Sequence, residues 1–288
     1  MHNIKIIRDN PKEFEKKIKS KNIILDINLI LDLDVQNRKL IQDKEKLEKE
    51  KKDISKLKDK SLFDKSKKIS VKIDELSKEQ STVKIKLEKI LSSLPNLPLD
   101  DVPIGKDESF NKEILTKGEI KKFNFKPKSH YELGEKLDML DFSLASKTSG
   151  SRFVFVKGRL AELERAISNF MIDTHIQING YKEISPPLIA NESTMYGTGQ
   201  LPKFENDQFK IDFDDKNERK FLIPTAEVIL TNMVRNQTLN LNFLPMRLVA
   251  STSCFRKEAG SYGKDTKGMI RQHQFYKVEL VSIVENNK

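Results

Sequence analysis

The sequence predicts an α+β protein in which a long helical hairpin precedes a domain of mixed helices and strands. Three observations carry this prediction. Residues 29–94 follow a heptad spacing, residues 95–117 are interrupted by prolines, and the patterns from residue 118 onward alternate between helix and strand. A chain of 288 residues is long enough for two domains. We therefore expect a helical arm at 1–94, a linker at 95–117 and a globular core at 118–288.

Two runs of residues spaced alternately by four and three positions predict the arm. Neither run contains Gly or Pro, and a short break near Ser61–Asp64 separates them. Helices joined by so short a connection must be antiparallel, so residues from about 27 to 94 predict an antiparallel two-helix coiled coil roughly 40–50 Å long. The predicted contact residues are Leu29, Leu33, Gln36, Leu40, Asp43, Leu47, Glu50, Ile54 and Leu57, then Ile69, Ile73, Leu76, Gln80, Val83, Leu87, Ile90 and Leu94.

The tip of this hairpin is basic. Residues 44–72 hold 12 Lys against 6 Asp or Glu, a net charge of +6, and the whole chain carries +10. Such a surface can lie along a nucleic-acid backbone. It can equally be the ordinary solvated surface of a coiled coil, where Lys and Glu mix freely. The chain has 43 Lys against 10 Arg, so general composition explains part of the charge and both interpretations stay open.

Several classes of protein are disfavoured by what the chain lacks. One cysteine, Cys254, allows no intramolecular disulfide and no Cys cluster for zinc, and the four histidines have no metal-ligand spacing. The N-terminus has no signal-peptide pattern, and no window of about 18 apolar residues exists that could span a membrane. We expect a cytoplasmic protein with no protein-bound metal, no zinc and no membrane partner.

The segments MRLVASTSCFRKEA and MIRQHQFYKVELVSIV predict a strand hairpin around the loop AGSYGKDTKG. Alternation puts Arg256 and Glu258 on one face of the first strand, and Arg271, His273, Phe275, Lys277 and Glu279 on one face of the second. Guanidinium groups, carboxylates and a ring can bind a nucleotide. Cross-strand ion pairs on an exposed face are the alternative. The segment PTAE has a similar alternative, with Thr225 as a helix N-cap.

These segments resemble a known family. FRKEAGSYGKDTKGMIRQHQF closely resembles motif 2 of class II aminoacyl-tRNA synthetases, in the form found in seryl-tRNA synthetases of bacterial type. The coiled coil ahead of the core is similar to the layout of that family. The resemblance extends to its motif 1, its serine-binding segment, and its linker and first catalytic strand, in GYKEISPPLIANESTMYGTGQLPKF, FLIPTAEV, LPNLPLDDVPIGKD and LDFSLASKTSGSRFVFVKG.

The resemblance implies a serine–tRNA ligase with a class II antiparallel-sheet catalytic domain at 118–288. Such an enzyme activates L-serine with ATP to seryl-adenylate and transfers the seryl group to tRNA(Ser), and in the family also to tRNA(Sec). It implies Mg²⁺ on the phosphates, tRNA held by the arm and by the motif 2 loop at residues 259–269, and a homodimer when the protein is full length. The alternative is a non-catalytic tRNA-binding coiled-coil module derived from a synthetase.

The resemblance also implies roles for individual residues. Arg256 matches the catalytic arginine that holds the ATP α-phosphate and the serine carboxylate. Phe275 matches the ring that stacks on adenine, and Arg271 is expected to brace phosphate or the loop. The implied ATP-binding residues are Arg256, Lys257, Glu258, Arg271 and Phe275. The implied serine-binding residues are Thr225, Ala226, Glu227 and Glu279.

One part of the family pattern is missing from the sequence. No glycine-rich motif 3 with its arginine occurs before Lys288. We therefore expect an incomplete, C-terminally truncated catalytic domain, with the Mg²⁺ ligands beyond residue 288. We also expect residues 1–288 alone not to aminoacylate tRNA.

Overall fold

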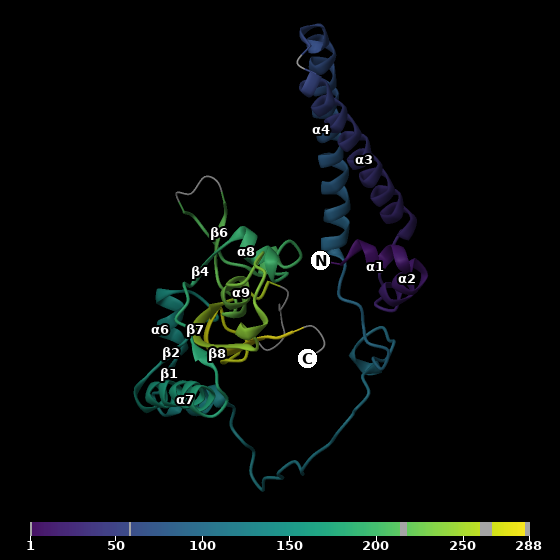
Figure 1. The fold of residues 1–288 in the computed structure, drawn as a ribbon. Coiled ribbons are helices and arrows are strands. Elements are labelled where there is room, and N and C mark those ends of the chain that lie inside the picture. Colours follow the sequence, from purple (N-terminus) through teal and green to yellow (C-terminus); the bar gives the residue numbers. More distant parts are fainter. Residues whose placement is uncertain (1, 58, 214–217, 260–266, 286–288) are drawn as a thin grey trace. The chain divides into compact units, whose positions relative to one another are not determined.

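The computed structural model describes residues 2–57, 59–213, 218–259 and 267–285 (Figure 1). It divides the chain into two units, Met1–Glu119 and Ile120–Lys288. Each unit is built around its own buried apolar residues, so each is described separately.

The first unit contains the predicted helical hairpin. Helices α3 (Ile27–Leu57) and α4 (Phe63–Ser93) are joined through a short 3-10 turn at Lys60–Leu62. Each helix has 31 residues and is therefore about 46 Å long. Gln80 Nε2 donates to Asn37 Oδ1 at 3.0 Å, and Lys65 Nζ lies 2.8 Å from Glu50 Oε1. These two cross-links confirm the antiparallel arrangement (Figure 1).

The contact face of α3 differs in part from the predicted one. Leu29, Gln36, Glu50 and Leu57 are exposed, whereas Asp34 is buried and Asn37 turns toward α4. The heptad spacing assumes a single partner helix, but the Asp34 end of α3 also faces α1. Asp34 Oδ2 is 3.2 Å from Arg8 Nε and 3.0 Å from Arg38 Nε, so two guanidinium groups compensate the buried charge. On α4 every predicted contact residue is buried or half-buried.

Two short helices complete the base of the arm. They are α1 (Ile4–Asp9) and α2 (Pro11–Lys19), and the Asn10 side chain caps α2 by accepting from Glu13 N at 3.4 Å. Their buried residues pack with both arm helices in one cluster: Ile7, Phe14, Ile18, Leu25, Ile27, Ile30, Leu87 and Leu91. The segment from residue 95 to 129 is irregular except for a 3-10 turn at Glu108–Phe110.

In the described part of the chain, the second unit contains three sheets. The first pairs β1 (Leu140–Asp141) with β2 (Phe155–Val156). The second has the order β3 (Lys182–Glu183), β7 (Met246–Phe255), β8 (Gln274–Ile283), with β3 parallel to β7 and β7 antiparallel to β8. The third is antiparallel, in the order β4 (Ile189–Asn191), β6 (Lys220–Leu222), β5 (Lys210–Ile211).

Helices connect and cover these sheets. They are α5 (His130–Lys136), α6 (Phe142–Thr148), α7 (Gly158–Gln177), α8 (Glu192–Gly197) and α9 (Glu227–Asn232), with 3-10 turns at Glu205–Asp207 and Leu241–Phe243. None of the helices in the described ranges is long and apolar enough to cross a membrane.

The β7–β8 hairpin has two differently used faces. On one face, Ala226 and Leu230 near α9 pack against Leu248 and Ala250 of β7. On the other face lies α7, whose Ser168 Oγ is 2.8 Å from Ser251 Oγ (Figure 1). Phe275, Lys277 and Glu279 of β8 lie on the α9 face.

Two predicted strands are shorter than expected. In the segment that resembles the first catalytic strand, SRFVFVK forms only the two-residue strand Phe155–Val156, because Arg152 has φ +62°, outside the extended region. The strand expected from Met269 starts only at Gln274, so Arg271 and His273 precede it. Gly268 has φ +77°, and the Met269 amide bonds to His130 instead of a neighbouring strand.

Candidate active site

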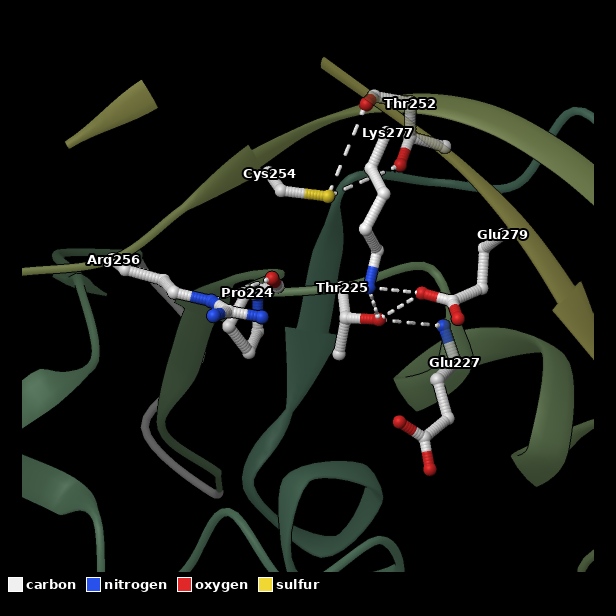
Figure 2. Close-up of polar contacts among 8 residues, drawn as sticks. All are labelled: Pro224, Thr225, Glu227, Thr252, Cys254, Arg256, Lys277 and Glu279. Atoms are coloured by element: carbon white, nitrogen blue, oxygen red, sulfur yellow. Dashed lines mark hydrogen bonds and ion pairs between the residues drawn. The ribbon is translucent and has the colours of Figure 1, made fainter. Parts of the chain in front are cut away.

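The pairing of β7 with β8 gathers a row of polar side chains on the face toward α9. Cys254 lies opposite Phe275, Thr252 opposite Lys277, and Ala250 opposite Glu279. The loop entering α9 brings Thr225 to the same place (Figure 2).

A closed cluster of hydrogen bonds joins Thr225, Lys277 and Glu279. Thr225 is 4% exposed, and its hydroxyl donates to Glu279 Oε2. Lys277 Nζ donates to Thr225 Oγ1 at 2.7 Å and forms an ion pair with the same Glu279 oxygen. The backbone N–H of Glu227 also donates to Thr225 Oγ1, at 3.3 Å. This arrangement offers a carboxylate in a half-buried setting, suited to a small cationic or hydroxyl-bearing ligand.

The other two residues of PTAE take different positions. Ala226 is fully buried and packs against β7, so its side chain is not presented to a ligand. The Glu227 carboxylate is exposed and points away from Lys277 and Glu279 (Figure 2). The structure thus brings Thr225 and Glu279 together but not the Glu227 side chain.

Arg256 and Phe275 lie on the same side of the hairpin. The Arg256 guanidinium carbon is 5.3 Å from the centroid of the Phe275 ring, within cation–π range. Its Nε donates to the Pro224 carbonyl at 3.3 Å, which ties it to the segment that carries Thr225 (Figure 2). The guanidinium therefore contacts both the aromatic ring and the segment that carries Thr225. His273 Nδ1 lies 2.9 Å from the Arg256 carbonyl, so this ring supports backbone.

Glu258 is held in an unusual backbone conformation, with φ +51°. Arg271 Nη1 donates to its Oε2 at 2.8 Å, and Arg152 Nη1 donates to its carbonyl at 3.0 Å. Asp207 binds on both sides of it. The Asp207 carbonyl accepts from Lys257 N and its carboxylate accepts from Ala259 N, each at 2.9 Å. A non-glycine residue in the left-handed region needs such surrounding contacts.

Lys257 and the motif 2 loop are the remaining parts of the predicted site. The Lys257 side chain is exposed, with its ammonium 5.7 Å from the Phe209 ring centroid. Of the motif 2 loop predicted at 259–269, residues 260–266 lie outside the described part of the chain. After the loop, Met269 N donates to His130 Nε2 at 2.8 Å.

Cys254 lies on β7 opposite Phe275 and is completely buried. Burial raises the pKa of its thiol, so the neutral thiol dominates near neutral pH. It acts as a small apolar residue. Over the described residues, no group of three or more His, Cys, Asp or Glu side chains is arranged to hold a metal ion.

Three residues at the site were not singled out from the sequence. Strand alternation placed Lys277 on the correct face. Its position two residues before Glu279 could have indicated that it contacts the serine site. Asp207 and Arg152 gave no signal, because each contacts Glu258 or its neighbours only through tertiary folding.

Comparisons with known proteins match both units of the chain to one family. Residues 1–98 match the seryl-tRNA synthetase N-terminal domain, and residues 208–288 match the class II core domain of the G, H, P, S and T tRNA synthetases. The serine–tRNA ligase of Pelagibacter ubique (strain HTCC1062) is 68% identical over 288 residues, which are 100% of this chain and 69% of the relative. That of Ehrlichia canis (strain Jake) is 47% identical, over 99% of this chain and 68% of the relative.

Solved structures show the same fold. Seryl-tRNA synthetase from Pyrococcus horikoshii complexed with ATP superimposes with a TM-score of 0.82 at 32% identity, over 98% of this chain and 69% of that one. Cytoplasmic serine–tRNA ligase from Naegleria fowleri with AMP has a TM-score of 0.78 over 97% of this chain and 65% of that one. Its identity of 24% supports the fold alone. Since family models match both units and a relative is 68% identical over the whole of this chain, the chain belongs to the seryl-tRNA synthetase family of class II aminoacyl-tRNA ligases.

Proposed function

We propose that the β7–β8 face and the loop entering α9 hold seryl-adenylate during serine activation and transfer to tRNA(Ser). In the first step a serine carboxylate oxygen attacks the ATP α-phosphorus, and pyrophosphate leaves. In the second step a terminal tRNA hydroxyl attacks the seryl carbonyl, and AMP leaves. Transfer to tRNA(Sec) by the same site is part of the proposal. Neither step needs a protein nucleophile, so positioning and charge neutralisation are the tasks of the protein.

One observation carries this assignment. The Arg256 guanidinium lies over the Phe275 ring and bonds the Pro224 carbonyl, next to Thr225, which in turn bonds Glu279. A guanidinium there binds two oxygens at once, so it suits the carboxylate and the α-phosphate that react with each other. The Phe275 ring takes the adenine, and Glu279 with Thr225 takes the serine ammonium and hydroxyl.

The other predicted residues line the nucleotide or support the serine pocket. Glu258 and the Lys257 backbone line the nucleotide, and Arg271 braces Glu258 through their ion pair. Ala226 supports the serine pocket from below, and Glu227 contributes its backbone N–H to Thr225.

Mg²⁺ is proposed to arrive with ATP. It would neutralise charge on the phosphates. The two carboxylates that face the site, Glu258 and Glu279, are each paired with a cation from the chain, so neither fits as an open Mg²⁺ ligand. In the proposal the ion is held by phosphate oxygens, and its protein ligands are not these two residues.

The arm is proposed to bind tRNA through the lysines near its tip, including Lys51, Lys52 and Lys56. Lys58, which belongs to the same basic stretch, lies outside the described residues. Double-stranded RNA is read mostly through its backbone and shape, and ammonium groups along a rigid helix suit that task. The motif 2 loop would meet the acceptor end.

A homodimer working in the cytoplasm completes the proposal. Helix α7 exposes large apolar side chains that a second copy would cover: Leu163, Ile167, Phe170 and Met171. Sedimentation at micromolar concentration should show twice the chain mass, and a monomer throughout would contradict the dimer. Recovery of the protein with membranes after cell fractionation would contradict the location.

The function is tested by calorimetry with two non-hydrolysable sulfamoyl analogues, of seryl-adenylate and of alanyl-adenylate. Binding needs no turnover, so residues 1–288 can be used directly. We expect the seryl analogue to bind at least about 10-fold more tightly, because a pocket built for a hydroxyl leaves polar groups unpaired when the hydroxyl is missing.

Arg256→Lys should weaken the seryl analogue by about 10- to 100-fold, because the bidentate contact is lost. Arg247→Lys is the matched control on the same strand, and it should bind like the wild type. The alternative function, a tRNA-binding module without chemistry, predicts that neither analogue binds. The intact arrangement of Arg256, Phe275 and Glu279 favours the ligase.

A further inference from the structure

The ammonium group of Lys277 lies inside the proposed serine pocket. Lys277 is on β8 opposite Thr252, between Phe275 and Glu279 on the same face. Its side chain is 31% exposed and that of Glu279 is 19% exposed. The lysine therefore reaches inward along the sheet to Thr225 and Glu279 (Figure 2).

The contacts leave one position of the cluster open. The Thr225 hydroxyl gives its proton to Glu279 and accepts from both Lys277 Nζ and Glu227 N, so its bonding capacity is used. Both contacts to Glu279 fall on Oε2. Within the described residues, the second carboxylate oxygen, Oε1, is left as the acceptor that a ligand can reach.

We propose that Lys277 is a positioning residue for serine. By holding Glu279 Oε2 and Thr225 Oγ1 together, its ammonium fixes the carboxylate so that Oε1 accepts a hydrogen bond from the ligand. The inference rests on the proposed function, because it assumes that serine binds at Glu279. It predicts that Lys277 affects the binding of serine and does not affect the binding of ATP.

A competing arrangement has the opposite consequence. If the Lys277 ammonium merely fills the place of the serine ammonium, its removal would strengthen serine binding. The structure favours positioning, because Lys277 bonds Thr225 and Glu279 at once. Glu279 without this cation would be a half-buried charge with its compensation removed.

The test compares Lys277→Met, which keeps the chain length and removes the charge, with Lys277→Arg and Lys277→Gln. Binding of the seryl-adenylate sulfamoyl analogue and of ATP is measured by calorimetry, and folding is checked by thermal denaturation. We expect Lys277→Met to weaken the seryl analogue at least 10-fold and to change ATP binding less than threefold. Lys277→Arg and Lys277→Gln keep a hydrogen-bond donor, so they should lose less affinity for the seryl analogue than Lys277→Met does. Lys182→Met, an exposed lysine on β3, is the matched control and should bind both ligands like the wild type.

A double-variant cycle makes the test specific. In a Glu279→Gln background, Lys277→Met should cost less than twofold, because the carboxylate that it positions is gone. Equal or tighter binding by Lys277→Met, or an equal loss for both ligands, would overturn the inference while leaving the proposed function standing. Failure of the wild type to bind the seryl analogue would remove both. If Lys277→Met does not fold, Lys277→Gln decides: a larger loss of affinity for the seryl analogue than for ATP supports the inference, and an equal loss for both ligands, or none, overturns it.

Discussion

At the proposed nucleotide site, the neighbours of Glu258 hold its backbone in a left-handed conformation. Its backbone at φ +51° costs on the order of 1 kcal/mol for a side chain with a β-carbon. Three neighbours hold it there: Arg271 on the carboxylate, Arg152 on the carbonyl, and Asp207 on the flanking amides. Strain supported from several sides is typical of sites that must not relax when a ligand leaves.

Asp207 is the clearest test of this support. Asp207→Ala should lower the free energy of unfolding by about 1–3 kcal/mol, because the Ala259 N–H loses its charged acceptor. It should also weaken ATP binding, because Glu258 is then free to leave its conformation. Asp207→Asn keeps a side-chain oxygen and should fall between Asp207→Ala and the wild type. Urea denaturation and calorimetry measure the two effects. Unchanged ATP affinity in Asp207→Ala would show that Glu258 does not need this support.

At this scale the sequence predicted which side chains share a face but not what they contact. Alternation placed Arg256, Phe275, Lys277 and Glu279 on one surface, and the pairing of β7 with β8 shows them there. The bond from Lys277 to Thr225 joins residues 52 positions apart. Such partners depend on how α9 docks on the hairpin, which no local pattern contains.

At the scale of elements, the arm shows the strength and the limit of heptad spacing. The whole predicted contact face of α4 is confirmed, because α4 packs chiefly against α3. The predicted face of α3 is wrong at Leu29 and Gln36, where the helix also faces α1 and Asp34 turns inward. It is also wrong at Glu50 and Leu57 near the tip, where both side chains are exposed. A repeat pattern predicts the middle of a two-helix interface well, and a three-helix junction or the end of a hairpin poorly.

The tip of the arm gives the prediction that belongs to this scale. Changing Lys51, Lys52 and Lys56 together to Gln should weaken tRNA(Ser) binding. It should also reduce the slope of log affinity against log salt by roughly 2, if each lysine neutralises one phosphate. The comparison is Lys84, Lys86 and Lys89 together changed to Gln, which removes the same charge farther from the tip of α4. Filter binding at several salt concentrations decides, and equal losses in both triple variants would show that only overall charge matters.

At the scale of the whole molecule, the two units use their cations differently. Eight of the ten arginines follow residue 150, and the other two, Arg8 and Arg38, both pair with Asp34. All the cationic side chains at the arm tip, residues 44–72, are lysines. Arginine offers fixed, paired donors for one defined ligand, whereas lysine offers a mobile point charge for a long backbone. This division fits a protein that holds a small nucleotide in one unit and a tRNA with the other.

The fold class, two long helices followed by a domain with an antiparallel sheet, was predictable from the sequence because each part has its own period, heptads in the arm and alternation in the core. The resemblance to the synthetase motifs supplied what the periods could not, namely which of many polar residues meet ATP and serine. The small sheet of β4, β5 and β6 was not predicted in detail, since its strands have only two or three residues each.

The central claim is that one face of the β7–β8 hairpin holds serine and adenylate together. It is tested most directly by a crystal structure with the seryl-adenylate sulfamoyl analogue bound. The account predicts adenine stacked on Phe275, the sulfamoyl group within hydrogen-bonding distance of Arg256, and the seryl ammonium or hydroxyl on Glu279. An analogue bound elsewhere, or one that touches neither Arg256 nor Glu279, would contradict it.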